Sequence, residues 1–264
     1  MDLKPCLDEL RIKGHTVIPD VLTQVFAEEV KARTWALANQ TEARGIPTRD
    51  IPVDPNDRSI RLANLIDGDE VFRDLILHPV ALEVIRSLIG DEFLISNFSA
   101  NIALPGARSM KMHSDLALVF PEPWLIPMSL NIGWCLDDVS EANGSTRVLS
   151  GSHLYKTRAE LPADALDLMV SVKAKKGSIV VMDGRLWHTS GNNVSDGERG
   201  MLFGYYSADF LRQQQNWAVT LSSETKKGLS RDLRERLGIT PRGNARLADY
   251  LNFPREKDAM VEDA

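Results

Sequence analysis

The segment from residue 128 to residue 136 limits the fold of this chain most strongly, because its side chains alternate strictly in character. Successive side chains of a β-strand point to opposite faces of the sheet, so this alternation predicts a strand with two unlike faces. One face would carry Met128, Leu130, Ile132, Trp134 and Leu136, and the other Ser129, Asn131, Gly133 and Cys135. The large apolar face suits a core, whereas the small face suits the inside of a barrel that leaves room for a ligand.

Further runs rich in β-forming residues lie at 15–18, 93–104, 178–182 and 200–207. From about residue 91 onward, these runs are separated by long loops, and no helical pattern lies between them. Strands joined in this way favour an antiparallel barrel or sandwich over a parallel sheet.

The first ninety residues are mainly helical in pattern. Asp20 is a suitable N-cap for a helix whose apolar positions continue to about Asn39. Pro79 suits the first turn of a second helix, and Gly90 suits its C-terminal cap. Residues 41–60 are polar and contain three prolines, which predicts a loop.

The length of the chain, 264 residues and 29.4 kDa, is enough for one large domain with a sizeable core. We expect a single domain over residues 1–264. It would consist of a helical N-terminal part at about 1–90, a barrel at about 91–210 and a C-terminal helical segment at about 211–264. The hydrophobic content of 43% and the charged content of 26% are ordinary for a globular protein.

Charge and cysteine content argue against several classes of protein. The net charge is −6 and no basic run stands out, so we expect no nucleic-acid partner. The chain has no apolar run of about 18 residues and no long apolar stretch at its start, so we expect neither a membrane span nor a secretory signal. Two distant cysteines, Cys6 and Cys135, are not a disulfide framework. We expect a cytoplasmic protein, monomer or homodimer, that acts on a small molecule.

The triplet His113-Ser114-Asp115, followed later by His188, is the strongest chemical signal in the chain. Chance alone gives roughly 0.7 His-x-acid patterns in a chain of this composition, so the triplet needs its context. Residues two apart on a strand face the same side, and His188 ends another strand-like run. Two imidazoles and one carboxylate suit iron(II) and leave coordination positions open for a bidentate co-substrate and dioxygen. The alternative is a surface pair or a satisfied core histidine.

Arg199 follows His188 and precedes the strand-like run at 200–207. A guanidinium at that place could hold a small dicarboxylate through a planar pair of hydrogen bonds, which Arg does better than Lys. The alternative for Arg199 is a surface salt bridge with Glu198 or Asp196.

Several segments, taken in order, resemble the phytanoyl-CoA dioxygenase family of iron(II)/2-oxoglutarate oxygenases. They begin with Gly14-His-Thr-Val-Ile-Pro-Asp-Val-Leu22 and continue with His78-Pro79 and Pro105-Gly106. The metal triplet follows, then an Asn-Gly…Gly-Ser-His region ending at His153, and finally the segment around His188. The resemblance covers about residues 10 to 210.

The resemblance implies a fold that is mainly β with flanking helices, a double-stranded β-helix of the jelly-roll or cupin-like barrel type. It implies that His113, Asp115 and His188 bind iron(II). Arg199 matches the arginine that holds the distal carboxylate of the co-substrate 2-oxoglutarate. His153, in the Gly-Ser-His segment, would be structural and not a fourth ligand.

The resemblance also places several residues near the two small molecules. Ser190 and Ser140 sit where hydroxyl groups contact 2-oxoglutarate. Met110 departs from the family, since a polar residue that touches the co-substrate often stands there. Arg61 and Asn64 lie in a segment that can approach the pocket mouth, although a structural loop contact is at least as strong an alternative. The loop at 116–127, with Trp124, would be a substrate-binding element.

The activity implied is that of a dioxygenase that consumes O₂ and 2-oxoglutarate, releases succinate and CO₂, and hydroxylates a small metabolite or natural-product intermediate. Asp115 argues against halogenation, because halogenating relatives lack the metal carboxylate. Desaturation and cyclisation stay open. A non-catalytic binding barrel and a metal enzyme without 2-oxoglutarate stay open as well, although Arg199 argues against the metal enzyme.

Overall fold

The computed structural model describes residues 1–117, 119 and 122–239 of the chain, and its strands there form two antiparallel sheets. The larger sheet has the order β1-β7-β4-β9-β3-β2, and the smaller sheet has the order β6-β5-β8. The larger sheet consists of β1 (His15–Ile18), β2 (Ser59–Leu62), β3 (Phe93–Ala103), β4 (Ser129–Cys135), β7 (Ile179–Asp183) and β9 (Arg199–Ala208). The smaller consists of β5 (Thr146–Val148), β6 (Val170–Ser171) and β8 (His188–Ser190).

The two sheets share an apolar cluster, which shows that they face each other. The cluster contains Cys135 and Met201 from the larger sheet and Val148 from the smaller sheet. The result is the squashed barrel of a double-stranded β-helix, mainly β with flanking helices, as the sequence predicted.

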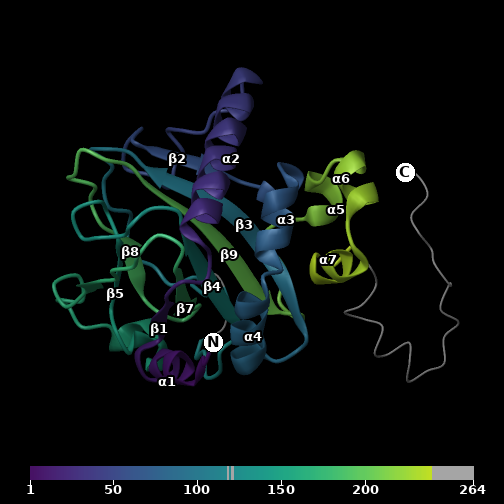
Figure 1. Cartoon of the computed structure of the whole chain (residues 1–264). Helices are drawn as coiled ribbons and strands as arrows, with labels where there is room; N and C mark the ends of the chain where they lie inside the picture. The colour runs from purple at the N-terminus through teal and green to yellow at the C-terminus, as the bar shows by residue number, and fades with distance from the viewer. Residues whose placement is uncertain (118, 120–121, 240–264) are drawn as a thin grey trace, which may run out of the picture.

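Helices cover the larger sheet. Figure 1 shows α2 (Gln24–Ala43), α3 (Glu70–Ile76) and α4 (Pro79–Ile89) lying across it. The main core fills this interface, where helix residues such as Val30, Phe72 and Ile85 and sheet residues such as Ile132 and Trp134 are fully buried. The remaining helical elements are α1 (Lys4–Lys13), η1 (Leu65–Asp67), η2 (Ser152–Leu154), η3 (Arg158–Glu160), α5 (Trp217–Thr220), α6 (Ser223–Gly228) and α7 (Arg231–Arg236).

The strand predicted from alternation at 128–136 is confirmed as β4, next to the centre of the larger sheet. Leu130, Ile132 and Trp134 face the helices and are fully buried. Asn131, on the opposite face, lines the interior of the barrel. The helix predicted from Pro79 to Gly90 is confirmed as well, with Gly90 in a positive-φ conformation just past its end.

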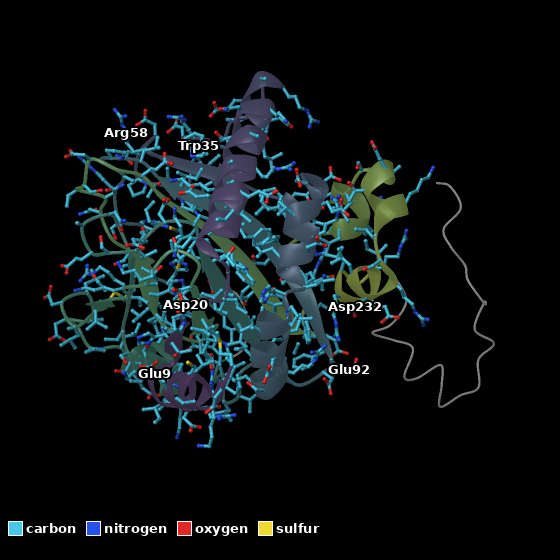
Figure 2. All side chains as sticks on the ribbon, viewed as in Figure 1. Glu9, Asp20, Trp35, Arg58, Glu92 and Asp232 are labelled. Atoms are coloured by element: carbon cyan, nitrogen blue, oxygen red, sulfur yellow. The ribbon has the colours of Figure 1, made fainter. Side chains whose placement is uncertain are left out.

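The start of α2 corrects the sequence analysis. Thr23, not Asp20, is the N-cap, and its hydroxyl oxygen accepts a hydrogen bond from the Phe26 amide at 3.1 Å. Asp20, labelled in Figure 2, adopts a φ of 54° in the preceding turn. Asp tolerates this left-handed conformation, so the same residue type suits a turn as well as a cap. The helix then continues past Asn39 to Ala43.

The end of the predicted loop at 41–60 is also corrected, because β2 begins at Ser59. This short edge strand pairs with β3, where Arg61 lies opposite Asn101. Its hydrogen-bond partners are distant in sequence, so local composition could not reveal it.

Beyond residue 211 the described chain forms three short helices, α5, α6 and α7, within the C-terminal helical segment expected at about 211–264. Residues 240–264 of the expected C-terminal segment lie outside the described residues. The single-domain organisation over 1–264 stays a prediction. Within the described residues, no helix combines the length and apolar character needed to cross a membrane.

Candidate active site

A cavity of about 180 Å³ opens between the two sheets and gathers most of the side chains singled out from the sequence. Its walls come mainly from β2, β3, β4, β7 and β9 of the larger sheet, from β5 and β8 of the smaller sheet and from the segment 107–115. His113, Asp115, His188, Ser190, Arg61, Met110 and Arg199 all line it.

The two histidines are brought together by a backbone bridge. The His113 amide donates to the His188 carbonyl oxygen at 2.9 Å, and the His188 amide donates to the His113 carbonyl oxygen at 2.8 Å. Residues directly opposite in such a bridge place their side chains next to each other. The ring centroids are accordingly 4.4 Å apart.

Both imidazoles present the same ring nitrogen to Asp115. Each Nδ1 lies 2.9 Å from a backbone carbonyl oxygen, that of Lys111 for His113 and that of Leu186 for His188. A carbonyl oxygen only accepts, so each Nδ1 carries the proton and each Nε2 keeps a free lone pair. The two Nε2 atoms lie 4.0 and 3.9 Å from the same Asp115 Oδ1.

Asp115 is held by its neighbours in the turn and by β4. The Asn131 side-chain amide donates to Asp115 Oδ2 at 3.0 Å, which fixes the carboxylate plane. The Ser114 hydroxyl donates to the Gly184 carbonyl oxygen at 2.8 Å and anchors the turn. Burial, helped by the neighbouring His188, lowers the pKa of His113 and favours its neutral, metal-binding form.

The three residues fit a transition-metal ion. One ligand atom from each of His113, Asp115 and His188 lies within 4.8 Å of the other two. Metal–ligand bonds are about 2.1 Å long, so Asp115 Oδ1, which lies 4.0 and 3.9 Å from the two Nε2 atoms, is close enough to share one ion with each of them. Two neutral imidazoles and one carboxylate on one side form the donor set of non-haem iron(II) sites. The surface-pair alternative does not hold, because all three line the cavity.

Arg199 enters the cavity from the first residue of β9 and is 2% exposed. One terminal nitrogen donates to the Gly144 carbonyl oxygen at 3.0 Å, while its Nε has no hydrogen-bond partner among the described residues. Burial lowers the pKa of Arg199 to about 10. A buried cation with an unused donor is costly unless a ligand supplies an anion, so this arrangement fits a carboxylate.

The salt-bridge alternative for Arg199 is wrong. Glu198 points the other way, where it pairs with Lys31 at 2.9 Å and accepts a hydrogen bond from Trp35, labelled in Figure 2. Lys31 also pairs with Asp137 at 2.7 Å, and Asp137 accepts from the Gly200 amide at 2.8 Å. This clamp, formed by Lys31, Glu198 and Asp137, ties α2 to the two residues that flank Arg199, through the Glu198 side chain and the Gly200 amide.

Of the two serines, the structure brings only Ser190 to the cavity. The Ser190 hydroxyl oxygen accepts from the Met110 amide at 3.0 Å. Ser140 does not line the cavity, and it lies in a loop where its amide donates to Asn143 Oδ1 at 2.8 Å. Met110 lines the cavity, and its sulfur lies 2.8 Å from a terminal nitrogen of Arg61.

The three expected substrate residues are also divided. Arg61 reaches the cavity but is engaged by both carboxylate oxygens of Asp54, at 2.6 and 2.8 Å. Asn64 lies outside the lining, and its amide donates to the Thr220 carbonyl oxygen at 2.8 Å. Trp124 is 4% exposed, also outside the lining, with its indole nitrogen bonded to the Val119 carbonyl oxygen at 2.9 Å. Asn64 and Trp124 are therefore in structural contacts.

His153 lies apart from the metal ligands, as a structural residue would. It is 2% exposed, and its Nε2 is 3.0 Å from the Arg11 carbonyl oxygen. Gly14, which has a φ of 78°, packs so closely against the His153 ring that an added Cβ would lie 2.5 Å from Nδ1.

Several polar residues of the cavity were not identified from the sequence. Asn131 was assigned to the small face of its strand, but its contact with Asp115 was not predicted. Asn97, Ser99 and Asn101 were not singled out, although they alternate with apolar residues along 97–102 and line the cavity from β3. That alternation is the signal that could have found them.

Comparison with known proteins agrees with this geometry. The model of the family described as phytanoyl-CoA dioxygenase matches residues 10–201. The relative "Dioxygenase af480" from Aspergillus fumigatus is 41% identical over 269 residues, which cover 100% of this chain and 87% of the relative.

Two solved structures share the fold. The non-heme alpha ketoglutarate dependent epimerase SnoN from nogalamycin biosynthesis superposes with a TM-score of 0.65 at 20% identity, covering 84% of this chain and 88% of SnoN. HygX from Streptomyces hygroscopicus, solved with nickel and 2-oxoglutarate bound, gives a TM-score of 0.65 at 17% identity and covers 81% and 90%. At such identities the likeness concerns the fold alone.

Proposed function

The chain belongs to the phytanoyl-CoA dioxygenase family, and on that premise we propose that it is an iron(II)- and 2-oxoglutarate-dependent dioxygenase that hydroxylates a small molecule. Succinate and CO₂ would be the products of the co-substrate. The substrate would be a small metabolite or natural-product intermediate.

One observation carries this proposal: the three-residue metal set and the unsatisfied guanidinium of Arg199 open into the same cavity. 2-Oxoglutarate carries a carboxylate at one end and a metal-chelating 2-oxo acid group at the other. A cavity with a cation at one place and a metal set at another matches both ends. The nickel and 2-oxoglutarate bound to HygX are consistent with this assignment.

Each protein residue has a role that follows from its contacts. His113, Asp115 and His188 would hold the ion, and the carbonyl partners of the two Nδ1 atoms fix the imidazole tautomers. Asn131 would keep the Asp115 carboxylate in one orientation. Iron(II), when bound, supplies the redox chemistry and the open coordination positions for co-substrate and dioxygen.

The co-substrate would be held by a small number of groups. Arg199 would hold its distal carboxylate, and Ser190 lies on the same wall as the metal ligand His188. Ser140 is not proposed for this role, since the structure keeps it out of the cavity. The sulfur of Met110 and the Asp54-paired Arg61 would form the side of the same compartment.

The experiment is a screen of candidate metabolites for substrate-stimulated succinate formation, with the organic product analysed by mass spectrometry. A product heavier by one oxygen atom supports hydroxylation. A product lighter by two hydrogen atoms would assign desaturation or cyclisation to the same site. If iron(II) and 2-oxoglutarate fail to bind, the site is not an oxygenase site and a non-catalytic binding barrel takes its place.

A further inference from the structure

The face of β3 that lines the cavity is polar over three consecutive inward positions. Asn97, Ser99 and Asn101, called here the β3 strip, all line the cavity. The residues between them, Phe98 and Ala100, face the helices and are at most 2% exposed. The alternation is therefore sharp: the back of this strand is core, and its front offers amides and a hydroxyl.

Asn101 is the most telling member of the β3 strip. It is 7% exposed, and its side-chain amide has no hydrogen-bond partner among the described residues. Its cross-strand neighbours are Arg61, which is engaged by Asp54, and Met201, which offers only a thioether. The Asn101 amide therefore faces the cavity without a protein partner and is available to hydrogen-bond a ligand.

The rest of the strip is only partly satisfied by protein. No side-chain hydrogen bond links Ser99 to another described residue, and its neighbour on β9 is Phe203. The Asn97 amide donates to Gln214 at 3.2 Å, while its oxygen has no partner in the described structure. Its neighbour Tyr205 instead donates to the Ser129 hydroxyl oxygen at 2.8 Å.

2-Oxoglutarate is too short to occupy the whole strip. On β9, Arg199 lies opposite Ala103 of β3, whereas Tyr205 lies opposite Asn97. Six residues of strand span about 20 Å, well beyond the length of a five-carbon diacid that is held at Arg199. The part of the cavity beside Ser99 and Asn97 therefore belongs to another molecule.

The composition of the whole cavity tells what kind of molecule fits there. Small-molecule pockets are usually lined mainly by apolar side chains, with a few polar groups. Here most of the lining residues carry a side-chain nitrogen or oxygen, although polar and apolar atoms contribute comparably to the exposed lining surface; the purely apolar side chains are Ala103, Ala107, Met110, Met182 and Phe203. A pure hydrocarbon would leave the polar groups of the strip without partners, and that loss disfavours its binding.

We propose that the β3 strip recognises the substrate, and that the substrate is a small molecule that already carries a hydroxyl or carbonyl group. Amides can donate and accept, so they suit either group. This inference rests on the proposed function, because it takes the Arg199 end of the cavity as the co-substrate site. It follows that a reaction which installs a hydroxyl or carbonyl group must precede this enzyme in its reaction sequence.

The test uses three probes with one carbon skeleton: bornane, the hydrocarbon; borneol, its alcohol; and camphor, its ketone. Each is titrated anaerobically into the full-length protein loaded with iron(II) and 2-oxoglutarate, and binding is followed by the change in the visible absorption of that complex. We expect borneol or camphor to bind at least about tenfold more tightly than bornane, the ratio of one well-made buried hydrogen bond.

The variants Asn97→Ala, Ser99→Ala and Asn101→Ala locate the preference. In at least one of them, we expect the preference for the oxygenated probe over bornane to fall about tenfold, mainly because the oxygenated probe binds more weakly. Asn216→Ala is the matched control, since Asn216 is exposed, lies outside the cavity and makes no side-chain cap hydrogen bond. If one strip variant does not fold, the other two still decide the question.

Three results would overturn the inference: bornane binding as tightly as the oxygenated probes, no probe binding at all, or a preference that survives in every strip variant. These results differ from failure of the proposed function, which would appear as a wild-type protein that forms no iron(II)–2-oxoglutarate complex. In that case the inference fails together with its premise.

Discussion

Replacement of Arg199 by methionine should make the ligand-free protein more stable while removing its affinity for 2-oxoglutarate. Burial lowers the pKa of Arg199 from 12.5 to about 10, which corresponds to a cost of about 3 kcal/mol for the charged guanidinium. Its hydrogen bond to the Gly144 carbonyl oxygen offsets about 1 kcal/mol of that cost. Arg199→Met, which is similar in length and apolar, should therefore raise the free energy of unfolding by about 2 kcal/mol, measured by urea unfolding without iron or co-substrate.

With 2-oxoglutarate present, the same substitution should weaken binding of the co-substrate and remove the stability that binding adds. Loss of a buried charge partner costs about 2–5 kcal/mol, so the dissociation constant of 2-oxoglutarate should rise by about 30-fold to a few thousandfold. 2-Oxoglutarate would then no longer stabilise the variant against urea. Arg199→Lys keeps the charge but loses the planar fork, so its affinity for 2-oxoglutarate should lie between those of the wild type and Arg199→Met. A ligand-free Arg199→Met protein that is less stable than wild type and still binds 2-oxoglutarate normally would refute the reasoning.

Three further changes test separate parts of the account. Lys31→Met breaks the clamp beside Arg199 and should weaken 2-oxoglutarate binding about fivefold while the affinity for iron stays unchanged. Lys31→Arg should keep the affinity for 2-oxoglutarate. Equal 2-oxoglutarate affinity in the wild type and both variants would show that the clamp does not position Arg199. Asp115→Gly removes the carboxylate of the metal set and should abolish substrate hydroxylation, so unchanged product formation would place the carboxylate ligand elsewhere. Gly14→Ala places a Cβ on a residue with a positive φ, 2.5 Å from the His153 ring, and should lower the free energy of unfolding by roughly 2 kcal/mol. An unchanged urea midpoint would show that the imidazole moves aside freely.

Much of the fold could be predicted from local pattern. The alternation at 128–136 located β4 and the apolar face on which the helices pack, and Pro79 with Gly90 located α4. What local pattern could not locate depends on distant partners. The edge strand β2 exists because β3 lies beside it, and the choice of Thr23 over Asp20 as a cap depends on where the chain turns into α2.

The candidate site divides in a similar way. The three metal ligands, His113, Asp115 and His188, and the cation Arg199 could be identified from residue type and order, because few residue types hold iron or a carboxylate. The hydroxyl contact expected of Ser140 and the substrate contacts expected of Asn64 and Trp124 rested on position along the chain alone. Loop geometry decides such contacts. It keeps Ser140 out of the cavity and turns the Asn64 and Trp124 side chains toward the Thr220 and Val119 carbonyl oxygens.

The measurement that tests the central claim most directly is an anaerobic titration of the protein with iron(II) in the presence of 2-oxoglutarate, followed in the visible spectrum. The account predicts a weak charge-transfer band that saturates at one iron per chain, and its loss in His188→Ala, because the bridge between His113 and His188 builds a single site. The protein should be checked for folding by circular dichroism. A wild-type protein without the band, or a His188→Ala protein that keeps the full band and affinity, would contradict the claim.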